Sequence, residues 1–129
     1  STIIAVSHMV KAHLLRWHGL PEQRIRVIPN GVNTAWFSPR NADTLRDSTR
    51  KAHGLIPEET VFLLVAHNLL LKNAEAAIRA MRPLAREGQP VRLVIVGGRR
   101  MKPFLRLCDR LGVREKVMFL DACTDMRPL

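Results

Sequence analysis

The 129-residue chain has no tyrosine, only two cysteines, and 11 acidic residues against 21 basic ones. Its longest apolar run, residues 61–66, is far shorter than the ~20 residues that a membrane-spanning helix needs. Cys108 and Cys123 are not spaced like metal ligands, and we expect Cys108 to be a reduced thiol on the apolar face of a helix. These absences exclude a disulfide scaffold, so we expect a cytoplasmic protein.

Well-known catalytic and nucleotide-binding motifs are also missing. The chain has no G-x-x-x-x-G-K-[ST] loop and no G-x-G-x-x-G turn after a strand, which excludes the usual P-loop and dinucleotide-binding families. It has neither an H-E-x-x-H zinc motif nor a G-x-S-x-G elbow. His8, His13 and His18 recur every five residues, which places successive side chains about 140° apart on a helix. We therefore predict no metal site, and no acid/base pair identifies a catalytic residue.

The net charge of +10 favours polyanionic partners such as nucleic acid, anionic lipid headgroups or phosphorylated ligands. The basic residues are scattered along the chain, and the few aromatic residues are not interleaved with them. A charge-driven nucleic-acid binder therefore stays only as a third hypothesis, and we expect no nucleic-acid partner.

Short apolar strands alternate with amphipathic segments along the whole chain. Strands are predicted at residues 2–7, 24–28, 60–66, 91–96 and 117–120, and helices at 8–18, 43–53, 74–87 and 103–111. This alternation indicates an α/β fold in which a parallel sheet has helices on both faces. Residues 33–49 show little periodicity. We therefore predict that residues 1–32 are the end of a first domain, that residues 33–58 are a linker with a short helix, and that residues 59–129 are part of a second domain.

The turn after the strand at 60–66 is the most informative segment. Lys72 lies in this turn, and Asn73 can cap the helix that opens directly after it. A cation and free backbone N–H groups at a helix N-terminus favour an anion such as phosphate. We therefore expect Lys72 to contact the diphosphate of a nucleotide and to stabilise the departing negative charge, the alternative being a solvated loop lysine.

Further residues follow the ends of the same two strands. His67 and Asn68 have donors for phosphate or sugar, but a packed histidine and an amide that satisfies turn backbone are equal alternatives. Gly97 and Gly98 indicate either close approach to a ligand or a tight turn that needs small residues. Arg99 and Arg100 follow this turn. We favour the interpretation that they are solvated basic residues at the start of a helix over a contact with phosphate.

In this order, the segments resemble the retaining glycosyltransferases of the GT-B fold, the family called glycosyl transferases group 1. Asn30-Gly-Val-Asn33 and Phe37-Ser-Pro39 are similar to the Asn-Gly-Val-Asp and Phe-x-Pro segments that join the two domains of that family. Residues 62–73 are similar to its first donor-domain strand and phosphate loop, and residues 93–120 to the β-α-β unit that follows.

The resemblance implies two Rossmann-like domains, of which this chain would hold the end of the acceptor domain and the first half of the donor domain. It implies that Lys72 contacts the donor diphosphate, that His67 takes the position of the family's arginine, and that Gly97 and Gly98 approach the donor. The family's Glu-x7-Glu segment is expected after Leu129, so the chain alone would not transfer sugar.

The same resemblance implies a function for the full-length protein. A sugar would pass from a UDP- or GDP-linked donor to a glycan or lipid-linked acceptor, as in polysaccharide or lipopolysaccharide biosynthesis, with retention of configuration and without a cofactor. The basic surface would suit peripheral contact with an anionic membrane at its inner face. The rival hypothesis is a nucleotide- or phosphate-binding α/β module without catalysis.

Overall fold

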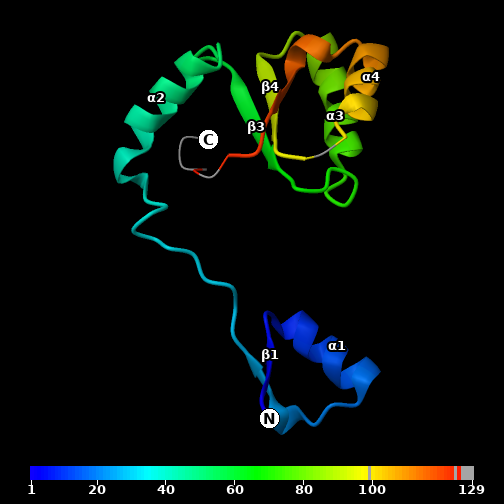
Figure 1. Ribbon diagram of the computed structural model, residues 1–129. Coiled ribbons are helices and arrows are strands. Elements are labelled where there is room, and N and C mark those ends of the chain that lie inside the picture. The colour runs from blue at the N-terminus through cyan, green and yellow to red at the C-terminus, as the bar shows by residue number, and fades with distance from the viewer. Residues whose placement is uncertain (99, 124, 126–129) are drawn as a thin grey trace. The chain divides into compact units, whose positions relative to one another are not determined.

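A computed structural model describes residues 1–98, 100–123 and 125, with the side chains of residues 41–43 left out of the description (Figure 1). Arg99, for which the sequence leaves a phosphate contact as an alternative, lies outside these residues. The chain divides into two compact units, Ser1–Ser38 and Pro39–Leu129. The division falls within residues 33–58, the segment that the sequence predicts to be a linker.

The first unit is a small β-α-β arrangement. Strand β1 (Ile3–Ala5) and strand β2 (Ile25–Val27) pair in parallel, and helix α1 (His8–His18) followed by the short 3-10 helix η1 (Glu22–Arg24) connects them. The Ser7 hydroxyl oxygen accepts a hydrogen bond from the Val10 N–H at 3.1 Å and caps the helix start. Gly19 is the C-cap of the helix, with a φ of +56° in the left-handed region that favours glycine.

The spacing of Val10, Leu14 and Trp17 at i, i+4 and i+7 predicts that they form one apolar stripe of α1, and the structure agrees only in part. Val10 and Leu14 are half-buried, but 64% of Trp17 is exposed. A three-residue strand extends roughly 10 Å, whereas an eleven-residue helix extends roughly 16 Å. The last turn of α1 therefore extends beyond its own strands, where Trp17 contacts the Arg16 guanidinium, 4.8 Å from the ring centroid, and the edge of the His13 ring, with centroids 6.5 Å apart.

The second unit contains a three-stranded parallel sheet in the order β3-β4-β5. Its elements are the short 3-10 helix η2 (Pro39–Asn41), α2 (Ala42–Ala52), β3 (Thr60–Val65), α3 (Ala74–Arg86), β4 (Val91–Val96), α4 (Lys102–Leu111), the 3-10 helix η3 (Arg114–Lys116) and β5 (Val117–Leu120). Phe62 of β3, Leu93 of β4 and Val117 of β5 share one register position. The described strands and α-helices occur where the sequence predicts them, with ends that differ by up to two residues, whereas the three short 3-10 helices were not predicted.

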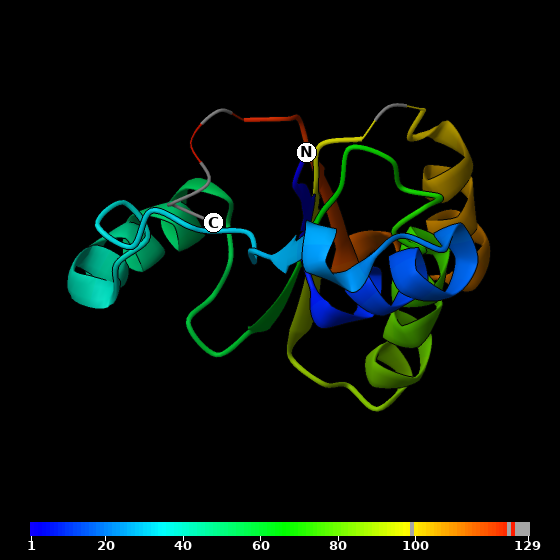
Figure 2. The ribbon, with the colours of Figure 1, turned by 90° about the horizontal axis from the view of Figure 1, so that it is seen from below.

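Helices α3 and α4 lie side by side on the same face of this sheet, as both ribbon views show (Figures 1 and 2). Strand β4 alternates its side chains and sends Val91, Leu93 and Ile95 toward these helices, where all three are buried. The helical side of this core is formed by Ala74, Ile78, Met81, Phe104, Leu107 and Cys108. The alternation of strands and helices predicts helices on both faces of the sheet. Neither α3 nor α4 covers the second face.

The two cysteines have different environments, and neither forms a disulfide. Cys108 is fully buried in the core, as the sequence predicts, whereas Cys123 is exposed. Burial raises the pKa of the Cys108 thiol above its ordinary value of 9.0. Cys108 is therefore an inert, apolar core residue.

A buried carboxylate joins several elements at the amino ends of the strands. One oxygen of Glu59 accepts hydrogen bonds from Arg92 Nε at 3.1 Å and Nη2 at 2.8 Å, and the other accepts from the Ile56 N–H at 3.2 Å. Arg92 also donates to the Glu115 carbonyl at 2.6 Å. Arg50 of α2 donates to the carbonyls of Ile56 at 2.7 Å and Glu59 at 3.0 Å. This network fixes α2, β3, β4 and η3 at the edge of the sheet opposite the candidate site.

Candidate functional site

The candidate site is the loop that connects β3 to α3 at the carboxyl edge of the sheet. Ala66 continues the ladder beyond β3 by donating its N–H to the Val96 carbonyl at 3.0 Å. The following loop, residues 67–73, is anchored by Leu69, of which only 2% is exposed. His67 and Lys72, the two predicted phosphate contacts, lie on either side of this anchor and are both exposed. The fold therefore holds the loop firmly while it leaves both polar side chains accessible to a ligand.

Asn68 organises the loop from within. Its side-chain oxygen accepts hydrogen bonds from the N–H groups of Leu70 at 3.1 Å and Leu71 at 3.2 Å. Its carbonyl accepts from the Lys72 N–H at 3.2 Å, and the Leu70 carbonyl accepts from the Asn73 N–H at 3.0 Å. Asn68 thus satisfies turn backbone, the alternative that the sequence left open. A contact between its amide nitrogen and a donor substrate stays a prediction.

The start of α3 differs from the expectation in two ways. Asn73 is the N-cap residue, but its side chain makes no capping hydrogen bond, so the predicted side-chain cap is wrong. Asn73 instead adopts a φ of +50°, the left-handed conformation that asparagine tolerates better than most residues. The expected free N–H groups are also partly engaged, because Ala74 donates to the Leu69 carbonyl at 2.9 Å and Ala76 to the Asn73 carbonyl at 3.0 Å.

Lys72 therefore carries most of the anion-binding argument. Its side chain has no hydrogen bond or ion pair with any residue that the structure describes. The positive end of the α3 dipole lies directly beside it and adds to the attraction for an anion. An exposed cation at the carboxyl edge of a parallel sheet is suited to a nucleotide diphosphate. The roles of Lys72 and His67 in donor binding stay predictions.

Gly97 and Gly98 form the turn after β4. Their φ angles are +80° and +85°, and a Cβ atom would lie 3.0 Å from the Ala66 carbonyl oxygen at Gly97 and 2.8 Å from Leu69 Cγ at Gly98. The Gly97 N–H donates to the Leu120 carbonyl at 2.9 Å. Neighbouring atoms of the chain itself thus leave no room for a side chain at either position. This agrees with the alternative that both glycines serve a tight turn. Their approach to a donor stays a prediction.

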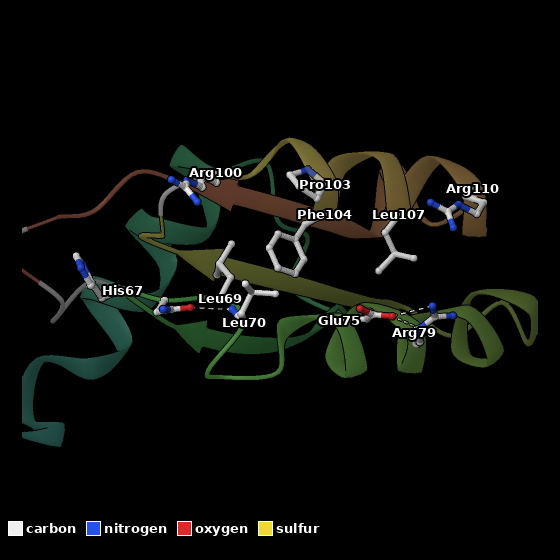
Figure 3. A pocket seen from close by; sticks show the side chains of 11 residues that line it. His67, Leu69, Leu70, Glu75, Arg79, Arg100, Pro103, Phe104, Leu107 and Arg110 are labelled. Carbon is white, nitrogen blue, oxygen red and sulfur yellow. Dashed lines mark hydrogen bonds and ion pairs between the residues drawn. The ribbon is translucent and has the colours of Figure 1, made fainter.

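A groove of about 710 Å³ extends from this loop between α3 and α4 (Figure 3). It is lined by His67, Asn68, Leu69, Leu70, Glu75, Arg79, Arg100, Pro103, Phe104, Leu107 and Arg110. Nothing in the sequence pattern predicts this groove. The helical periodicity indicates which residues face the sheet, but it does not indicate where two neighbouring helices diverge.

The groove has an apolar floor and a largely basic rim. Figure 3 shows Phe104 and Leu107 of α4 pointing into the groove, with Leu70 of the loop near Phe104. Glu75 and Arg79 form an ion pair at 2.7 Å on the α3 side, so their charges cancel. Arg100 and Arg110 lie on the α4 side and are both exposed.

No three His, Cys, Asp or Glu side chains among the described residues lie close enough together to hold a metal ion. No helix in the described part of the chain is both long and apolar enough to cross a membrane.

Comparison with known proteins identifies the family. The pattern described as Glycosyltransferase Family 4 matches residues 1–36, and that described as Glycosyl transferases group 1 matches residues 45–128. An uncharacterized glycosyltransferase of Methanocaldococcus jannaschii is 34% identical over 119 residues, which cover 92% of this chain and 30% of that protein. A D-inositol 3-phosphate glycosyltransferase of Segniliparus rotundus is 29% identical over 89% of this chain and 26% of its own length.

A solved structure shares the fold. The crystal structure of Anabaena HepE in complex with UDP and glucose superposes with a TM-score of 0.81 at 20% identity, over 99% of this chain and 35% of that protein. This likeness confirms the expected Rossmann-like α/β architecture as part of a GT-B fold. The chain spans about a third or less of the length of each of these three proteins. Because the second pattern matches well over half of the residues, the chain belongs to the glycosyl transferases group 1 family.

Proposed function

We propose that the chain is the junction and first donor-domain half of a glycosyltransferase that uses a UDP- or GDP-linked sugar. Membership of the glycosyl transferases group 1 family over residues 45–128 is the observation that carries this proposal. It is supported by the HepE structure, which contains UDP and glucose. The parts that complete the catalytic cleft would lie elsewhere in the full-length protein, so this chain alone is expected to be inactive.

In the proposed reaction, the bond between the anomeric carbon of the sugar and the diphosphate oxygen breaks. The anomeric carbon forms a new bond to an acceptor hydroxyl oxygen, which loses its proton, and a nucleoside diphosphate leaves. Lys72 stabilises the negative charge that develops on the diphosphate, together with the positive end of α3. His67 contributes a second contact from the other side of the loop. No metal or other cofactor is needed in this scheme, because the cation is supplied by the chain.

The acceptor and the stereochemistry are finer parts of the same proposal. We propose a glycan or lipid-linked acceptor, retention of the anomeric configuration, and a cytoplasmic protein in peripheral contact with an anionic membrane. The Segniliparus relative is described as acting on D-inositol 3-phosphate, which makes a small phosphorylated polyol the second candidate acceptor. Polysaccharide and lipopolysaccharide biosynthesis are the pathways in which a lipid-linked or glycan acceptor would place the enzyme.

The full-length protein that contains this chain can test the proposal in a transfer assay. It would be incubated with UDP- and GDP-sugars and with three acceptors: a lipid-linked glycan, a free glycan and D-inositol 3-phosphate. Release of nucleoside diphosphate that depends on one acceptor, with the donor's anomeric configuration in the product, is the expected result. Nucleotide binding without turnover on any donor and acceptor would instead favour the non-catalytic binding module.

A further inference from the structure

Arg100 has a strained backbone conformation in the turn after β4. Its φ is +63°, and among the residues that the structure describes the only other non-glycine residue with a positive φ is Asn73, in the loop between β3 and α3. Asparagine tolerates this left-handed region, whereas for arginine it costs free energy. Strained residues of this kind concentrate at ligand-binding sites. The conformation of Arg100 therefore indicates a role beyond that of a surface residue in a turn.

The turn that leads to Arg100 packs directly against the candidate site. A Cβ atom at Gly97 would lie 3.0 Å from the Ala66 carbonyl oxygen, and one at Gly98 would lie 2.8 Å from Leu69 Cγ. Leu69 is the buried anchor of the loop between β3 and α3. Arg100 follows two residues after this contact. The packing thus fixes the turn of Arg100 beside the loop that carries the proposed diphosphate contacts.

Arg100 and His67 line the same groove. Figure 3 shows both toward one end of it, whereas Arg110 lies toward the other end. The Arg100 side chain is exposed and makes no hydrogen bond or ion pair with any residue that the structure describes. Glu75, the one carboxylate that lines the groove, is already paired with Arg79 at 2.7 Å. The guanidinium of Arg100 is therefore available to an anion that enters at this end.

The charge of the proposed substrate favours a second permanent cation in the site. A nucleotide sugar carries a negative charge on each phosphate group, and breaking the bond to the sugar adds another. Lys72 supplies a single positive charge. A histidine gains or loses its charge between about pH 5 and 8, whereas an arginine stays charged and its planar fork matches two phosphate oxygens. An arginine beside the loop is therefore the better complement to Lys72.

We propose that Arg100 is a second cationic contact of the donor diphosphate and acts together with Lys72 of the neighbouring loop. This inference rests on the proposed function and adds a residue to its donor site. The sequence alone favours a solvated arginine at this position. The positive φ, the free guanidinium and the groove shared with His67 favour the phosphate contact instead. The donor is thus held from the loops that follow β3 and β4.

Nucleotide binding to the full-length protein, measured by calorimetry with UDP and GDP, tests this role. Arg100→Asn removes the charge and introduces a residue that tolerates a positive φ, so the variant is expected to fold. It is expected to bind nucleotide about tenfold or more weakly, because a hydrogen bond to a charged phosphate is lost. The matched control Arg110→Gln removes the same charge at the other end of the groove and is expected to change the affinity less than about threefold.

Thermal stability separates a binding role from a packing role. Arg100→Gly relieves the strain of the positive φ, so its thermal midpoint is expected to be unchanged or higher while its affinity for UDP falls about tenfold or more. A lower midpoint with unchanged affinity would show that Arg100 serves only the turn, and would overturn the proposal.

Competition against UDP identifies the part of the ligand that Arg100 contacts. Arg100→Asn is expected to weaken the competition by inorganic pyrophosphate and to leave that by uridine unchanged, because only pyrophosphate carries the charged oxygens. Weaker competition by uridine with unchanged competition by pyrophosphate would overturn the diphosphate contact.

The inference and the proposed function can fail separately. Equal affinities of the wild-type protein and Arg100→Asn for UDP and GDP would overturn the role of Arg100 and leave the donor site at Lys72 standing. Equal losses in Arg100→Asn and Arg110→Gln would also overturn it, because they would reflect the general positive charge of the groove. Absence of UDP and GDP binding in the wild-type protein would overturn the proposed function and this inference with it.

Discussion

The buried Glu59 carboxylate allows a quantitative test of the fold. Replacing it in Glu59→Ala removes three accepted hydrogen bonds, two from Arg92 and one from the Ile56 N–H. The Glu59 side chain is 6% exposed and that of Arg92 is 24% exposed. Removing one partner of a buried pair costs roughly 3–5 kcal/mol. Because water reaches part of Arg92, which also keeps the Glu115 carbonyl, we expect a loss of about 2–3 kcal/mol.

The matched control is Glu75→Ala, which also removes a carboxylate that pairs with one arginine. Glu75 and Arg79 are both about half exposed, at 51% and 54% of their side chains, so the expected loss is below about 0.5 kcal/mol. Equal destabilisation by the two substitutions would refute the reasoning that burial, and not pairing, determines the cost.

The assay must report on unfolding of the second unit. Tryptophan fluorescence of this chain cannot do so. Trp17 and Trp36 are the only tryptophans of the chain, and both lie in the first unit. Urea unfolding is therefore followed by far-ultraviolet circular dichroism and by thiol labelling of Cys108, which is buried in the core of the second unit. Both measurements are expected to give the same ranking of the two variants.

Two further predictions concern the glycines and the thiols. Gly98→Ala is expected to cost about 1–2 kcal/mol more than Gly88→Ala, because both have positive φ but only at Gly98 would a Cβ meet the buried loop leucine, at 2.8 Å; equal denaturation midpoints for the two variants would contradict this. In the native protein, a thiol reagent should modify exposed Cys123 at once and Cys108 only after unfolding. Because burial raises the pKa of Cys108, the thiol loses its proton at a lower pH in the unfolded chain than in the folded one. The free energy of unfolding should therefore fall as the pH rises above about 9. Cys108→Ala should reduce this fall.

Most of the fold is predictable because its determinants are local. Alternation of apolar strands with amphipathic segments predicts β4 and β5 with their observed ends, and Gly19 marks the end of α1 through its positive φ. The pair of Glu59 and Arg92 was not predicted, because 33 residues separate them and nothing local links them. The exposure of Trp17 was missed for a similar reason, since it depends on how far the neighbouring strands extend.

The candidate site was likewise only partly predictable from the sequence. The sequence places Lys72 in an exposed loop at the end of a strand, and the structure agrees. Which N–H groups remain available depends on hydrogen bonds within the turn, and the sequence does not show that Asn68 and the loop carbonyls already accept most of them. The groove between α3 and α4, which exposed Leu70 lines, results from the packing of two helices and was not anticipated.

Nucleotide binding to the full-length protein tests the central claim most directly. Calorimetry with UDP and GDP would compare Lys72→Ala with Lys51→Ala, which removes an exposed lysine of α2 in the same unit. Loss of one contact to a charged phosphate is worth about 1.5–3 kcal/mol, so Lys72→Ala is expected to weaken binding roughly 10- to 150-fold and Lys51→Ala to leave it unchanged. Equal affinities of the wild-type protein and Lys72→Ala would contradict the assignment of this loop as the donor diphosphate site.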